Sequence, residues 1–227
     1  MKKTFLLLTA ISLASFSFVS CKDDKNTDEP ESSTVLCPFA DGNKWTYIVE
    51  SKLSNSSLPE VSYLTEGLVF QVKSFTFDGK TGYSYESTLS NDKNFALMNT
   101  DKNGNIVELH FKDGKYIDES IMYKKDAKAG EKYKAQMFIE DEDGGELYDM
   151  DMACVKRDTT LKVPAGNFNC ICYCMTIYDN GAVSDKFYSF YAENVGLIQD
   201  VKYEFNNKPG EDSVMMNRKT LNSYELK

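Results

Sequence analysis

Cysteine is the residue type in this sequence whose spacing could serve metal or redox chemistry. On an extended strand the alternating Cys170, Cys172 and Cys174 point to one side at intervals of about 7 Å, so they do not converge on a tetrahedral metal site. Neighbours in such a row cannot easily pair as disulfides either. With Cys37 and Cys154 they make an odd set of five besides Cys21, and we expect buried core thiols.

Acid–base catalysis would draw on His110, the only histidine of the chain. Val107, Leu109 and Phe111 alternate on one face of a strand, so His110 is predicted on the opposite, solvent-facing side. The sequence has no Gly-x-Ser-x-Gly nucleophile elbow, no phosphate-binding loop and no dinucleotide fingerprint. It therefore predicts no catalytic residue and no cofactor.

Two polar loops have the oxygen side chains of a calcium site. Asp101 and Asn103 occupy ligand positions in residues 99–106, but this loop lacks the first Asp and the bidentate Glu of a complete calcium loop. A second acidic loop offers Asp141 and Asp143. A hairpin turn explains the first loop and plain solubility the second, so no metal ion is expected.

The first twenty residues predict an export signal. Lys2 and Lys3 precede an apolar stretch, residues 5–19, that is too short for a stable span, and small residues precede Cys21. Residues 18–21 resemble a bacterial lipobox, which implies removal of residues 1–20 and lipidation of the Cys21 sulfur. The acyl chains would anchor the protein to a membrane without spanning it.

Residues 21–36 are polar and charged at their start and predict a disordered tether. Lys22, Asp23 and Asp24 resemble the short acidic export signal of surface-exposed lipoproteins of the Bacteroidota. This resemblance implies an outer-membrane lipoprotein of the cell envelope, while the periplasmic leaflet stays the alternative location. The whole chain carries a net charge of −9, which argues against nucleic acid as a partner.

Residues 37–227 predict a single all-β domain, because short alternating runs are separated by turn residues and no long 3.6-residue period follows the signal. Asp78-Gly79 and Asp113-Gly114 are typical of hairpin turns. Trp45, the only tryptophan, is expected to anchor the core. Before Phe75 the apolar residues switch from one face of the strand to the other, which predicts a β-bulge near residues 73–74.

Four short patterns resemble a recurring type of uncharacterised lipoprotein from the same bacteria. In chain order they are Gly42-Asn43-Lys44-Trp45, Ala129-Gly130-Glu131-Lys132-Tyr133, Val163-Pro164-Ala165-Gly166-Asn167-Phe168 and Val195-Gly196-Leu197. The resemblance implies a strongly curved antiparallel meander sheet, a half-barrel or barrel similar to those of lipoprotein carriers. A two-sheet β-sandwich is the alternative fold, and the resemblance implies no activity.

The aromatic content, with 14 Tyr and 14 Phe, favours a binding function. Residues 168–177 and 187–191 are apolar on both sides, so Phe168, Tyr173, Phe187 and Tyr191 could line an apolar cavity. We therefore expect a non-enzymatic, lipid-anchored binding or accessory protein whose ligand is a lipid, a glycan or a protein. The alternative is an envelope glycan hydrolase with two carboxylates about 5 to 9 Å apart, but 35 acidic residues single out no pair.

Overall fold

The computed structural model describes residues 34–53, 63–87, 97–139, 145–179, 181–205 and 213–227. Within these residues lie twelve strands: β1 (Lys44–Lys52), β2 (Tyr63–Phe77), β3 (Lys80–Ser87), β4 (Leu97–Thr100), β5 (Ile106–Lys112), β6 (Lys115–Tyr123), β7 (Lys132–Ile139), β8 (Glu146–Val163), β9 (Gly166–Asp179), β10 (Ala182–Ala192), β11 (Gly196–Glu204) and β12 (Val214–Glu225). None of the described segments is a helix long and apolar enough to cross a bilayer.

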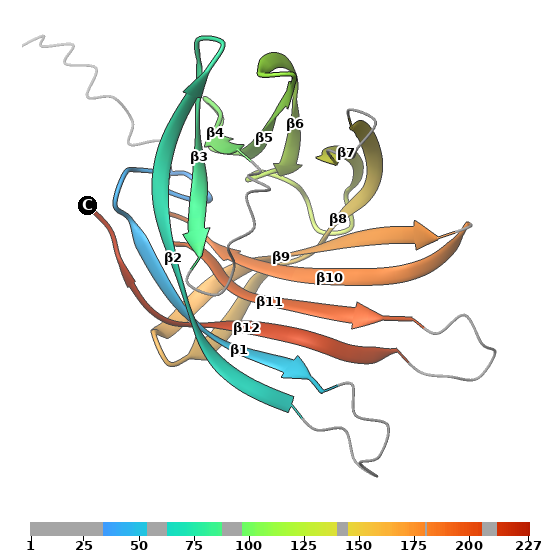
Figure 1. The fold of residues 1–227 in the computed structure, drawn as a ribbon. Coiled ribbons are helices and arrows are strands. Elements are labelled where there is room, and N and C mark those ends of the chain that lie inside the picture. Colours follow the sequence, from blue (N-terminus) through green and yellow to red (C-terminus); the bar gives the residue numbers. More distant parts are fainter. Residues whose placement is uncertain (1–33, 54–62, 88–96, 140–144, 180, 206–212) are drawn as a thin grey trace, which may run out of the picture. The chain divides into compact units, whose positions relative to one another are not determined.

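The twelve strands form one antiparallel sheet in the order β6-β5-β4-β3-β2-β1-β12-β11-β10-β9-β8-β7 (Figure 1). Each strand pairs with its neighbour in the chain except at β6 and β7, which do not pair with each other, and β1 also pairs with β12. The sheet therefore has its first and last strands in the middle and its two edges at β6 and β7. The predicted curved meander is confirmed, and the two-sheet sandwich is wrong because all twelve strands belong to one sheet.

The predicted hairpin turns are confirmed by their backbone angles. Asp78 and Gly79 have φ values of 46° and 73°, and Asp113 and Gly114 have values of 52° and 71°. Two successive positive φ values are those of a type I′ turn, whose twist matches that of the flanking strands. Local turn chemistry thus sets the register of the β2–β3 and β5–β6 hairpins.

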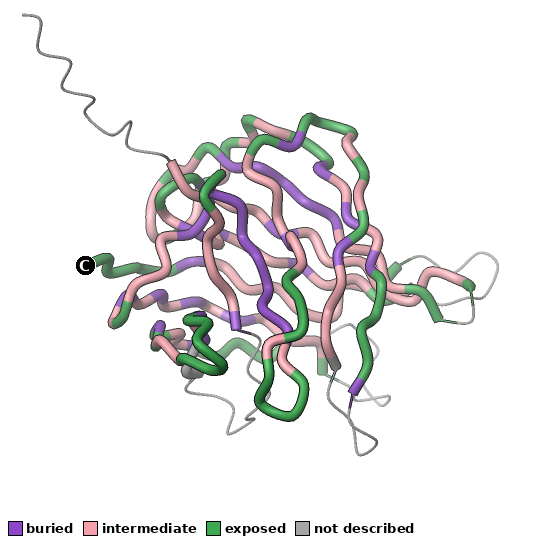
Figure 2. The backbone as a smooth tube through the Cα atoms, turned by 90° about the horizontal axis from the view of Figure 1, so that it is seen from above, coloured by how far each residue is buried: buried purple, intermediate pink, exposed green. Residues whose placement is uncertain are grey.

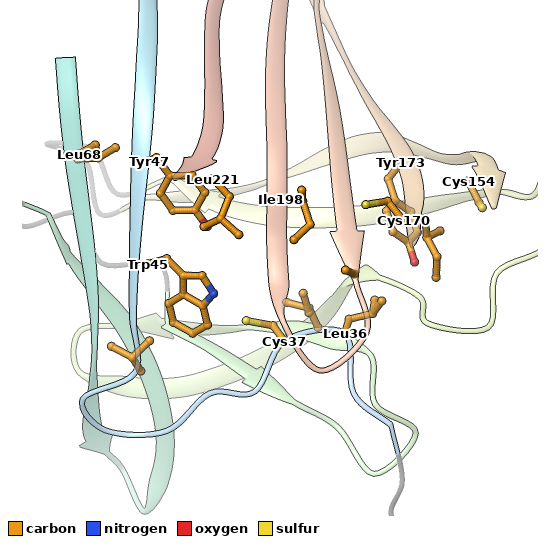
Figure 3. Close-up of a cluster of buried hydrophobic side chains, with 14 of the residues drawn as sticks. Leu36, Cys37, Trp45, Tyr47, Leu68, Cys154, Cys170, Tyr173, Ile198 and Leu221 are labelled. Carbon is orange, nitrogen blue, oxygen red and sulfur yellow. The ribbon is translucent and has the colours of Figure 1, made fainter. Parts of the chain in front are cut away.

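The main core lies inside the curve of the sheet. Ile106 of β5 and Tyr173 of β9 belong to the same buried cluster, although their strands are far apart in the sheet order. Trp45 is 1% exposed and lies in this cluster close to Cys37 (Figure 3). Buried residues form runs along several strands, and hairpin tips are exposed (Figure 2).

Two of the four sequence patterns meet in this core. The indole Nε1 of Trp45 donates a hydrogen bond to the carbonyl oxygen of Val195 at 2.8 Å. The hydroxyl of Tyr47 donates to the carbonyl oxygen of Leu197 at 2.9 Å. The Gly-x-x-Trp and Val-Gly-Leu patterns therefore form one structural unit that fixes the start of β1 against the β10–β11 turn.

The two edge strands, β6 and β7, lie next to each other and are joined through side chains. The backbone N–H of Gln136 donates to Oγ of Ser120 at 2.7 Å, and the hydroxyl of Tyr133 donates to the carbonyl oxygen of Met122 at 2.9 Å. The strand order ends at these two strands, so no ladder closes the sheet between them. We call this junction the β6–β7 seam.

The packed part of the chain includes residues ahead of Cys37. Leu36 is 0% exposed and belongs to the main core, and its backbone N–H donates to the carbonyl oxygen of Gly104 at 3.1 Å. The N–H of Asn194 donates to the carbonyl oxygen of Val35 at 2.7 Å. The segment expected as a tether thus already contributes to the fold at its end.

The bulge predicted near residues 73–74 is wrong. The pairing of β2 with β3 runs without a shift from Phe70 to Phe77. Phe75 instead packs on the other face of β2, against a smaller cluster that contains Leu97, Val107 and Leu109. The apolar residues change face along β2 because the end of this strand is covered on its second face.

Candidate functional site

A groove of about 420 Å³ lies on β10, β11 and β12. Gln199, Val201 and Tyr203 contribute to it from β11, on the side opposite to the buried Ile198. Since Ile198 belongs to the main core, the groove is on the other side of the sheet at this point. The complete lining is Tyr188, Phe190, Gln199, Val201, Tyr203, Phe205, Ser213, Met215 and Arg218.

The strand register places these side chains in rows across the sheet. Tyr188 of β10 lies opposite Val201 of β11, which in turn lies opposite Arg218 of β12. The next row pairs Tyr203 with Met215, after a register shift in the β11–β12 pairing. Because directly paired residues of neighbouring strands point to the same face, three strands supply one continuous surface.

Aromatic rings form much of the groove. The rings of Tyr188 and Tyr203 meet edge to face, with centroids 5.8 Å apart and an interplanar angle of 86°. Burial, followed by the neighbouring Cys174, raises the pKa of Tyr188, so its hydroxyl stays neutral at physiological pH. Nζ of Lys186 lies 5.2 Å from the centroid of the Phe205 ring. The rings offer flat apolar faces, which suit an apolar ligand or one face of a sugar.

One ion pair gives the groove a charged end. Nε of Arg218 lies 2.6 Å from Oε2 of Glu50, and this hydrogen bond lowers the pKa of the Glu50 carboxyl and raises that of Arg218. The bridge fixes the position of a guanidinium group that carries five N–H donors. The groove thus combines aromatic rings with an oriented cation, an arrangement that can hold a ligand with an apolar body and an anionic or hydroxyl head.

Of the four predicted cavity residues, only Tyr173 and Tyr191 are in ring contact with each other. Tyr173 is 0% exposed, and its ring centroid lies 6.2 Å from that of Tyr191 inside the curve of the sheet. Phe168 also packs against the main core, but its ring contact is with Tyr224, at a centroid distance of 6.1 Å. Phe187 lies beneath Nζ of Lys202 at 5.4 Å. None of the four predicted residues lines the groove.

The calcium candidate Asp101 serves its own turn. Its Oδ1 accepts hydrogen bonds from the backbone N–H groups of Asn103 and Asn105, at 2.8 and 2.9 Å, and its Oδ2 accepts one from the side chain of Asn105 at 2.8 Å. Across the described residues no group of three or more His, Cys, Asp or Glu side chains could hold a metal ion. Asp141 and Asp143 lie outside the described residues, as do Cys21, Lys22, Asp23 and Asp24.

The predicted core thiols are confirmed. Cys37, Cys154, Cys170, Cys172 and Cys174 are all buried, and no disulfide joins any two of them. Burial raises the pKa of Cys170 to about 12 and that of Cys172 to about 11. These side chains therefore behave as small apolar groups of the fold.

The predicted exposure of His110 is wrong, because its side chain is fully enclosed. Residues 106–110 of β5 are buried on both faces, and the backbone of Gln136 in β7 approaches the imidazole. Both ring nitrogens lack a hydrogen-bond partner in the described part of the chain. Beside His110 lies Glu108, which the sequence analysis did not single out and which is also buried.

Sequence reasoning also missed the groove, because its residues come from three strands and Glu50 is far from Arg218 in the chain. Val201 and Tyr203 do alternate with Lys202 in the sequence, which is typical of one face of a strand. In β12, however, Met215-Met216-Asn217-Arg218 shows no clean alternation. The one usable signal is an arginine within an apolar strand, which is too common to identify a site.

No protein-family model matches this chain, and no curated protein matches it either. Among solved structures, the chain is similar to a "putative lipoprotein" from Parabacteroides distasonis, at 15% identity and a TM-score of 0.44, over 86% of this chain and 100% of that one. It is also similar to a "putative exported protein with YmcC-like fold" from Bacteroides fragilis, at 16% identity and a TM-score of 0.38, over 85% of this chain and 100% of that one.

Proposed function

We propose that this chain is a lipid-anchored, non-enzymatic binding protein of the bacterial cell envelope, and that the groove on β10, β11 and β12 binds a small amphiphile. The observation that carries this proposal is the meeting of the aromatic pair Tyr188 and Tyr203 with the Arg218–Glu50 ion pair in one groove. A volume of about 420 Å³ lies in the range of small-molecule sites.

The anchor is inferred from the sequence. Cys21 follows an export signal directly, and a polar segment separates it from Leu36, where the buried core begins. Acyl chains on Cys21 would hold the protein at the outer membrane. Treating intact cells with a protease tests surface exposure: digestion supports the surface, and survival supports the periplasmic leaflet.

The proposed ligand follows from the two parts of the groove. Apolar rings gain free energy by covering an apolar body, about 25 cal/mol for each Å² removed from water. A guanidinium group held by Glu50 can donate paired hydrogen bonds to a phosphate, carboxylate or hydroxyl head. A lipid or a lipid fragment with such a head satisfies both parts, and a glycan satisfies them less well because it lacks an apolar body.

Native mass spectrometry tests the proposal. The exported chain with Cys21→Ser, which cannot be acylated, is purified without detergent from the envelope fraction of its own host. We expect a bound amphiphile that is lost from Tyr203→Ala and Arg218→Gln. It should remain in the control variants Tyr148→Ala and Lys134→Gln, whose side chains are exposed elsewhere.

Two results would overturn this function. One is an empty protein, which would point to a surface that binds other proteins. The other is a ligand that stays bound in both groove variants, because it would have to lie elsewhere in the fold. Unfolding curves of the variants show whether any loss of ligand comes from loss of the fold.

A further inference from the structure

Most methionines of the described residues lie in one place. Three of them are fully enclosed and form a compact group with Ala135, and three more pack against that group. No buried member of the larger main core is a methionine. We call the following residues the methionine cluster: Met98, Met122, Met137, Met150, Met152 and Met175.

The strand register places several methionines of this cluster side by side. Met152 of β8 lies directly opposite Met175 of β9, so their Cβ atoms are about 5 Å apart. Met150 lies on the same face of β8, two residues along the strand, and Met122 enters from β6. A methionine side chain has three rotatable bonds, so neighbouring sulfur atoms can turn toward one ion.

Thioether sulfur is a soft, neutral donor that selects Cu(I) among the common metal ions. We propose that the methionine cluster binds one Cu(I) ion, with the sulfur atoms of Met150, Met152 and Met175 as ligands and Met122 as a fourth. This site lies inside the curve of the sheet, apart from the groove, and does not rest on the proposed function of the groove.

The cluster lies beside the β6–β7 seam, where the ladder of the sheet is interrupted. Met122 and Met137 belong to β6 and β7, the two strands of the β6–β7 seam. Hydrogen bonds through Ser120 and Tyr133 join these strands in place of a ladder. Met137 is only partly buried, so the cluster extends from the enclosed Met152 toward the surface.

Cys154 is the competing soft ligand, because it follows Met150 and Met152 on the same face of β8 and is fully buried. The thiolate, and not the thiol, binds metal ions well. Burial raises the pKa of Cys154, so the thiol form prevails at neutral pH. Thioethers need no deprotonation, and the methionines are therefore the better ligands at this position.

Competition titration with bicinchoninate under anaerobic conditions tests the proposal, with Cu(I) itself as the probe and the exported chain carrying Cys21→Ser as the protein. We expect one Cu(I) per chain and a rise in Tm when it binds. The double variant Met152→Leu and Met175→Leu should bind Cu(I) at least 100-fold more weakly. Leucine conserves the volume of methionine, so this variant should keep its fold without metal.

Two single variants serve as controls. Met215→Leu alters a methionine of the groove, and Cys154→Ser removes the nearest thiol. Both should bind Cu(I) as the parent chain does. The proposal is overturned if the parent does not compete with bicinchoninate, if Cys154→Ser abolishes binding, or if the double methionine variant binds normally.

Discussion

Nε2 of His110 lies 3.8 Å from Oε1 of Glu108, and the two side chains are only 0% and 5% exposed. Burial raises the pKa of Glu108 to about 7, an effect that the backbone N–H of Phe138 partly offsets. Burial also lowers the pKa of His110, while Gln136 and Asp118 act in the opposite direction. Below about pH 7 the Glu108 carboxyl is therefore mostly protonated, and the fold holds a neutral carboxyl group in its interior.

This pair predicts a pH-dependent stability that Glu108→Gln should change. Between the unperturbed value of 4.5 and about 7, folded Glu108 keeps a proton that the unfolded chain has lost. Its contribution to the free energy of unfolding therefore falls as the pH rises through this window. Glu108→Gln should match the parent near pH 4.5 and become more stable above pH 7, by on the order of 3 kcal/mol.

Urea unfolding at a series of pH values measures this difference. Glu131→Gln is the matched control, because the backbone N–H of Lys128 and the side chain of Lys124 lower the pKa of Glu131. Its stabilising effect is present above the unperturbed pKa and is lost as the pH falls, so Glu131→Gln should be the less stable chain at neutral pH. Equal pH slopes for Glu108→Gln and the parent would contradict the buried carboxyl group.

The core has no room for a side chain at Gly196. Its φ is +104°, and an added Cβ would lie 3.0 Å from Sγ of Cys37 and 3.6 Å from the ring of Trp45. Gly196→Ala should therefore cost roughly 2 to 4 kcal/mol, from backbone strain and overpacking together. Gly79→Ala has a positive φ of 73° but nothing within 4 Å, so it should cost only about 1 kcal/mol. If both variants lost the same free energy of unfolding, the close approach to Cys37 and Trp45 would not contribute to the cost at Gly196.

The parts of the fold that the sequence predicts are those with local causes. Asp78-Gly79 forms its turn because two adjacent residues accept positive φ, and no distant contact is needed. Trp45 is an expected core residue because its size and its place in an alternating run both favour burial. The meander follows from such hairpins in succession, since each turn pairs a strand with the next one.

The parts that escaped prediction depend on distant contacts. Alternation puts His110 on the second face of β5, and only the approach of β7 makes that face an interior. The groove requires β12, whose pairing with β11 shifts register between Lys202 and Tyr203. Glu50 and Arg218 meet only because the first and last strands pair. Such relationships depend on strands that are distant in the sequence, such as β1 and β12, and leave no pattern within one strand.

The buried cysteines predict a protein with no reactive thiol in its native state. Because the pKa values of Cys170 and Cys172 are raised to about 12 and about 11, little thiolate forms at pH 8. In the chain with Cys21→Ser, Ellman's reagent should label no thiol quickly before unfolding and five thiols in denaturant. Ser213→Cys, at an exposed position, is the positive control and should react at once. Rapid native labelling of the parent would contradict the buried thiols.

The hydrogen bond of Tyr47 joins the Gly-x-x-Trp region to the Val-Gly-Leu pattern. Removing it should show how much this link contributes to the free energy of unfolding. The Tyr47 hydroxyl, on a side chain that is 3% exposed, donates to the carbonyl oxygen of Leu197 at 2.9 Å. Tyr47→Phe should cost about 1 to 2 kcal/mol, because it removes the donor. Unfolding can be followed by the fluorescence of Trp45, the only tryptophan.

Tyr63→Phe is the matched control for Tyr47→Phe. The hydroxyl of Tyr63 also donates to a backbone carbonyl, that of Met215 at 3.2 Å, but its side chain is 36% exposed. Water can replace this hydrogen bond at the surface, so the loss should be under about 0.5 kcal/mol. If both variants lost the same stability, the Tyr47 hydrogen bond would have no special role, and the pattern around Leu197 would act through apolar packing alone.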